Sequence, residues 1–83
     1  MRNYIVRLIM ETDEIKWVKL KADQISDIFK SCNNYNFSRW KMAQLNKDYA
    51  PQIIKIEVFN DNNKFIFSSD PYMNDEGLLV FSI

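Results

Sequence analysis

Basic and aromatic side chains gather at two places in this sequence, and these are the residue types best suited to binding a partner. The first set alternates along one extended segment and consists of Trp17, Lys19 and Lys21. The second set is consecutive and consists of Arg39, Trp40 and Lys41. Lysines beside an aromatic ring can hold a phosphate backbone while the ring stacks a base. The same residue types also carry much of the binding energy of protein interfaces.

Groups that could transfer protons or act as nucleophiles are scarce. The sequence has no His, which removes the commonest general acid or base and every Ser-His or Cys-His arrangement. Its single Cys, Cys32, follows Ile25, Ile28 and Phe29 at helical spacing, which indicates a core position rather than a reactive one. We therefore predict no catalytic residues and no enzyme activity. A small His-free nuclease that works through Lys, Arg and Glu is the alternative.

Cofactor and metal sites are equally poorly supported. Gly77 is the only glycine, so a Gly-rich phosphate-binding loop is excluded. One cysteine can form neither a cysteine-based zinc site nor an intramolecular disulfide. Asp75 and Glu76, with Asp70, could surround a hard cation, but their spacing matches no calcium loop and favours a solvated acidic loop. The sequence predicts neither a metal nor a cofactor.

Size and composition are those of one globular unit. The chain has 83 residues, 47% of them hydrophobic, and we expect a single domain over residues 1–83. It lacks a secretion leader and a long apolar run, which predicts a cytoplasmic protein that does not enter the membrane. Net charge is zero, yet residues 1–47 carry nine basic and five acidic side chains, and residues 48–83 carry two and six. This asymmetry indicates either a partner surface or attraction between the halves, and whether the basic half forms one patch stays open.

Alternating apolar residues predict two hairpins. Segments 4–10 and 15–21 flank the polar turn 11–14, and segments 53–59 and 65–67 flank the polar turn 60–63. We expect Tyr4, Val6, Leu8 and Met10 to share one face of a well-covered interior strand, and Ile54, Ile56 and Val58 to share one face of the third strand. After a polar loop at 68–77, the apolar segment 78–83 is expected to be a strand held in the same sheet.

The middle of the chain is expected to be helical. Asp23 stands at a capping position, and Asn33 and Asn34 favour a helix end after about ten residues. Residues 35–51 favour a second short helix, although residues 38–46 also suit a strand. The expected fold is therefore α+β. It has a small antiparallel or mixed sheet of about five strands, with one or two short helices packed on one face, in the order ββα(α)βββ.

The combined pattern predicts a small non-catalytic protein-interaction module. A nucleic-acid-binding module is the alternative, although zero net charge and a pI of about 6.2 are atypical of that class. A free sheet edge would also allow a homodimer. The abundance of Ile, Asn and Lys is typical of AT-rich genes. With the short chain, it fits a small gene of an AT-rich bacterium, a phage or a plasmid. From a phage or plasmid, we expect such a module to inhibit or regulate a host protein.

Overall fold

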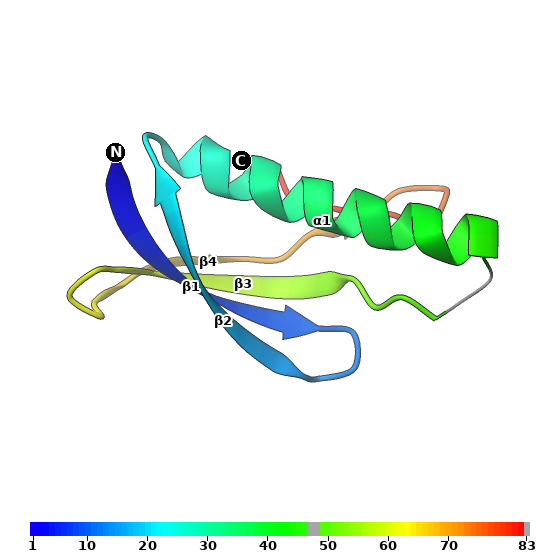
Figure 1. The fold of residues 1–83 in the computed structure, drawn as a ribbon, viewed down its shortest axis with the longest axis horizontal. Helices are drawn as coiled ribbons and strands as arrows, with labels where there is room; N and C mark the ends of the chain where they lie inside the picture. The colour runs from blue at the N-terminus through cyan, green and yellow to red at the C-terminus, as the bar shows by residue number, and fades with distance from the viewer. Residues whose placement is uncertain (47–48, 83) are drawn as a thin grey trace.

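The computed structural model describes residues 1–46 and 49–82, and in them one helix lies along one face of a sheet (Figure 1). The elements are β1 (Arg2–Met10), β2 (Ile15–Ala22), α1 (Ile25–Asn46), β3 (Ile53–Asn60), β4 (Phe65–Ser69), β5 (Tyr72–Met73) and β6 (Leu79–Val80). The four long strands pair antiparallel in the order β2-β1-β3-β4, while β5 and β6 form a separate ribbon. The α+β class and the antiparallel sheet are confirmed.

Both predicted hairpins are present. β1 pairs with β2 along its length, and the turn between them is closed by Asp13, whose φ of 68° is in the left-handed region. In the β3–β4 turn the Asn60 carboxamide oxygen accepts the backbone N–H groups of Asn62 and Lys64, at 2.9 and 3.0 Å, and Asn63 has a φ of 64°. Asp and Asn tolerate this conformation better than other residues with a Cβ, so local side-chain chemistry determines both turns.

We call the sheet face that meets α1 the inner face and the opposite one the outer face. The four β1 residues predicted to share a face, from Tyr4 to Met10 in alternation, lie on the inner face and belong to the core. In β3 the prediction holds for Ile56 and Val58, but Ile53 is buried and Ile54 is only half-buried. The pairing of β3 with β1 shifts register between Ile9 and Met10, which face Lys55 and Ile53, and this changes the inward–outward alternation of β3 at its start. A bulge of this kind turns a strand residue to the other face.

The helix is a single continuous element of 22 residues, which corrects the predicted end at Asn33 and Asn34 and the separate second element. Asn33 and Asn36 do not terminate the helix, because their carboxamides bind backbone groups of other segments. Asn36 is completely buried and donates to the carbonyl oxygens of Ile53 and Leu79, both at 3.1 Å. Within the described residues, no helix has the length and apolar character needed to cross a membrane.

The helix also begins differently from the prediction. Its first residue is Ile25, and the backbone N–H groups of Asp23 and Gln24 donate to the Asp27 carboxylate at 3.2 and 3.1 Å. A side chain in the first helical turn that accepts the backbone N–H of the residue just before the helix forms half of a capping box. Asp23 is therefore not the capping residue, and its carboxylate lies 3.5 Å from the Met1 amino group.

The C-terminal segment was expected in the main sheet, and this prediction is wrong. The strand β6 in this segment pairs with β5, which lies inside the predicted loop 68–77. Side chains of α1 and of the segment before β3 hold it in place. Asn33 makes a reciprocal pair with the Phe81 backbone, at 2.8 and 2.7 Å, and the Gln52 carboxamide oxygen accepts the Leu79 N–H at 2.8 Å. These polar contacts replace the strand pairing that the apolar pattern predicted.

Replacement of Asn36 by Ala should lower the free energy of unfolding by about 2 to 4 kcal/mol. The variant loses both donated bonds and the bond from the Ile53 N–H to Asn36 Oδ1, at 2.7 Å, and it leaves buried backbone groups without partners. Urea unfolding measures the change. Asn34→Ala, at an exposed position of the same helix, corrects for helix propensity. Equal stability of the two variants would contradict this role of Asn36.

Candidate functional site

The six predicted site residues fall on two separate parts of the molecule. Trp17, Lys19 and Lys21 lie on the outer face, because they alternate along β2 with Val18 and Leu20, which pack against the core. The second set, Arg39, Trp40 and Lys41, belongs to α1 on the inner side of the sheet. The structure therefore confirms that the first set shares one strand face, and it does not bring the two sets together.

A row of aromatic rings crosses the outer face. Trp17 of β2 reaches over β1 to Phe59 of β3, with ring centroids 5.7 Å apart and planes inclined by 35°. Phe59 meets Phe65 of β4 edge to face, also at 5.7 Å. Trp17 is 59% exposed and Phe65 is 57% exposed, so Trp17 does not fill the core. We call Trp17, Phe59 and Phe65 the aromatic row.

An ion pair lies beside the aromatic row. Arg7 of β1 pairs with Glu57 of β3 through a hydrogen-bonded salt bridge, and both side chains are half-buried. The Arg7 guanidinium also lies 5.9 Å from the centre of the Trp17 ring, within the range of a cation–π contact. This pair joins the basic and acidic halves of the sequence, and no other ion pair does so among residues 1–46 and 49–82.

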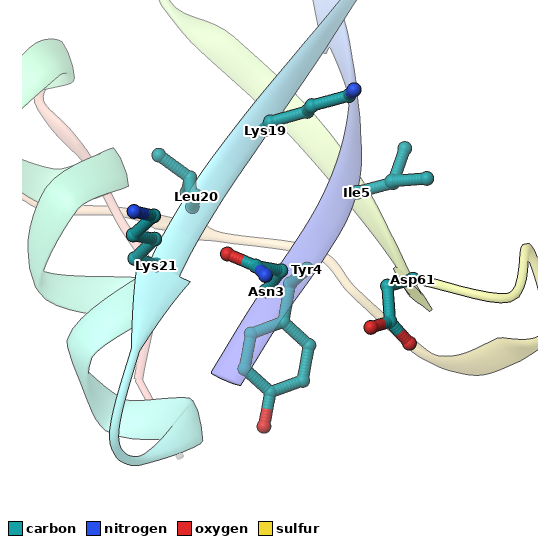
Figure 2. A pocket seen from close by; sticks show the side chains of 7 residues that line it. All are labelled: Asn3, Tyr4, Ile5, Lys19, Leu20, Lys21 and Asp61. Atoms are coloured by element: carbon teal, nitrogen blue, oxygen red, sulfur yellow. The ribbon is translucent and has the colours of Figure 1, made fainter. Parts of the chain in front are cut away.

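Next to the aromatic row, the first two strands border a hollow of about 350 Å³. Figure 2 shows Lys19 and Lys21 extending from β2, Asn3 and Ile5 on β1, and Asp61 in the loop after β3. Strand register places Asn3 beside Lys21 and Ile5 beside Lys19. The hollow thus combines two ammonium groups, one carboxylate, a carboxamide and an apolar wall, so that its basic side chains outnumber its acidic one. Such a set can hold a negatively charged group of a partner.

The residues of the second set mainly make contacts within the protein. The Arg39 guanidinium donates to the Tyr35 hydroxyl at 3.2 Å and lies 5.3 Å from the centre of that ring. Trp40 Nε1 donates to the carbonyl oxygen of Glu76 at 2.8 Å, and its ring contacts Phe37. Both side chains are half-buried, whereas Lys41 is exposed. Arg39 and Trp40 thus stabilise α1 and its contact with the turn before β6.

Chemically reactive groups are not assembled into a site. Cys32 is buried under the helix, as predicted, and burial raises the pKa of its thiol to about 11. A neutral thiol is a poor nucleophile and a poor metal ligand. No cluster of three or more metal-ligating side chains occurs among the residues that the structure describes. The outer face, with the aromatic row and the hollow, is therefore the candidate functional site.

Three residues of this surface were not among the predicted ones: Arg7, Phe59 and Phe65. The alternation of β1 and β3 does place Arg7 and Phe59 opposite the core residues. Their contact with Trp17 depends on strand order and register, which local patterns do not contain. A prediction that β1 lies between β2 and β3 would have brought these side chains together.

Comparison with known protein families, with curated proteins and with solved structures finds no match to this chain.

The buried thiol makes a pH-dependent contribution to stability. In the unfolded chain Cys32 ionises at its ordinary pKa of 9.0, whereas in the folded protein it keeps its proton to about pH 11. Above pH 9 the unfolded state therefore binds fewer protons, and the free energy of unfolding falls as pH rises. Between pH 8 and 11 we expect this group to lower the free energy of unfolding by about 2 kcal/mol. This is less than the energy that corresponds to the whole pKa shift, because the folded protein itself begins to lose the proton near pH 11.

Urea unfolding of the wild type and of Cys32→Ala across this pH range tests the expectation. The other ionisable groups are the same in both proteins, so the difference between the two curves isolates the thiol. The stability advantage of the wild type should shrink with rising pH. A constant advantage would show that the thiol is not protected by burial.

Proposed function

We propose that this chain is a small non-catalytic module that binds another protein through the outer face of its sheet. The aromatic row is the observation that carries the proposal. Its three rings contact one another across four strands, and two of them are more than half exposed. Isolated exposed apolar residues are common, but a connected group of rings marks an interaction surface.

The composition of the surface supports a protein partner. Trp and Arg are enriched among residues whose truncation weakens protein complexes, and Trp17 and Arg7 lie in contact here. Ile5, Ile9 and Ile15 lie on the same face and extend the apolar area on both sides of Arg7. The sheet is rigid and preformed, so binding through it costs little ordering of the backbone.

Inhibition or regulation of a host protein, and an origin in a phage or plasmid, stay predictions that add detail to this proposal. The small size and the residue usage support them. Cytoplasmic location also stays a prediction.

A second candidate function is binding of single-stranded nucleic acid. It is favoured by a specific feature, since Trp17, Lys19 and Lys21 share one open face of an antiparallel sheet whose other face is covered by a helix. Sheets that bind RNA use exposed rings to stack bases in this way. Affinity for an oligonucleotide that falls steeply with added salt would support this alternative.

Substitution of Trp17 by Ala should weaken partner capture by at least about tenfold, because large buried side chains at the centre of an interface contribute about 2 kcal/mol or more. The purified protein, fixed to beads, is incubated with a nuclease-treated bacterial lysate, and captured proteins are quantified by mass spectrometry. Tyr72→Ala is the matched control, because Tyr72 is 56% exposed and lies in the β5–β6 ribbon. Circular dichroism confirms that both variants are folded.

Trp40→Ala, measured in parallel, distinguishes the outer face from the second predicted set. Loss of capture with Trp40→Ala alone would place the interaction on α1. Capture from an untreated lysate that is lost after nuclease treatment would favour the nucleic-acid alternative. Unchanged capture by folded Trp17→Ala would contradict the proposed surface.

A further inference from the structure

The outer face has a net positive charge although the chain as a whole has none. Strand register places four cationic side chains on this face: Arg7, Lys19, Lys21 and Lys55. Glu57 is the acidic residue that register places among them, and it already pairs with Arg7. Asp61 lines the hollow and offsets part of this charge. Lys19, Lys21 and Lys55 have no ion-pair partner within the part of the chain that the structure describes.

The uncompensated lysines stand beside apolar surface rather than in a separate polar region. Lys19 lies opposite Ile5, and Trp17 is the next residue of β2 on the same face. Lys55 is paired with Ile9. A partner that covers the aromatic row must therefore bring groups that meet these ammonium ions, because an unpaired charge buried at an interface is costly.

We propose, on the basis of the interaction surface above, that its occupant is an acidic amphipathic segment of a partner protein. Apolar side chains of the segment pack on the aromatic row and the neighbouring isoleucines. Carboxylates of the segment meet the ammonium groups of Lys19 and Lys21, which extend in different directions from β2, and the Asn3 carboxamide also lines the hollow. The charge of the lysines selects the sign of the partner, and the rings supply most of the affinity.

A second copy of the same chain fits this face poorly. Face-to-face association would bring the lysines of one copy against those of the other, and the Glu57 carboxylate is already paired with Arg7. Pairing through the free edge of β2 meets the same difficulty, because Lys16, Lys19 and Lys21 line that strand.

A nucleic-acid strand also fits less well than an acidic protein segment. Phe65 meets Phe59 at an interplanar angle of 70°, and Arg7 covers Trp17 at 5.9 Å, so the rings are engaged with neighbours and do not form a series of parallel open platforms. The aliphatic side chains of Ile5, Ile9 and Ile15 suit apolar residues better than bases, which stack on aromatic planes.

The test uses defined fluorescein-labelled probes. One is a twelve-residue peptide in which Glu alternates with Leu and Phe, the second has Gln in place of every Glu, and the third is a twelve-nucleotide oligo-dT. Fluorescence anisotropy at low salt should give a dissociation constant about tenfold lower for the Glu peptide than for the Gln peptide, because two exposed lysine contacts contribute about this factor. Added salt should reduce the difference.

Charge-neutralised variants locate the effect. In Lys19→Gln/Lys21→Gln the preference for the Glu peptide should fall to within about twofold, since both lysines of the hollow are removed. Lys16→Gln/Lys30→Gln removes the same charge from positions off the outer face and should keep the preference. Amide chemical shifts should change for Ile5, Trp17 and Lys19 when the Glu peptide binds, and not for Lys30.

Several results would overturn the proposal. These are absence of peptide binding, equal affinity for the two peptides, an unchanged preference in Lys19→Gln/Lys21→Gln, tighter binding of oligo-dT than of the Glu peptide, and dimerisation that blocks the peptide. The protein-interaction function is tested separately by partner capture. If Trp17→Ala abolishes capture while both peptides bind equally, the surface is correct and only the acidic nature of its partner is wrong.

Discussion

The completely buried carboxamide of Asn36 connects three segments of this protein. It bonds to the backbone of Ile53 at the start of β3 and of Leu79 in β6, while its own backbone belongs to α1. A buried polar side chain is tolerated only when its hydrogen-bonding groups are satisfied, so this contact permits one position of the helix over the sheet. Together with Asn33 and Gln52 it also holds the C-terminal segment, which would otherwise expose Leu79 and Phe81.

Helix position then determines which surface is free. Because α1 lies on the inner face and β6 contacts it there, the outer face stays open in the described residues (Figure 1). Strand alternation sends every second side chain to that face. Beside the Arg7–Glu57 ion pair, this face carries rings, isoleucines and lysines. The one-sided core is thus the physical origin of the candidate site.

Part of the site was predictable from local pattern. Trp17, Lys19 and Lys21 share a face because the side-chain period of a strand is two, and the structure confirms it. Arg39, Trp40 and Lys41 also look like one group in the sequence. Consecutive helical residues point about 100° apart, however, so they do not share a face, and Arg39 and Trp40 contact Tyr35 and Glu76. The aromatic row joins β2, β3 and β4, and no local pattern contains that pairing.

The sequence by itself determined strands β1 to β4 and their two hairpins, because alternation and turn residues such as Asp13 and Asn60 act over a few positions. It also determined that Cys32 is buried. Only the tertiary structure decided the length of α1, the place of the C-terminal segment and the contacts of Trp17. An Asn side chain can end a helix or bond to a distant backbone group, and the choice at Asn33 and Asn36 depends on partners up to 48 residues away.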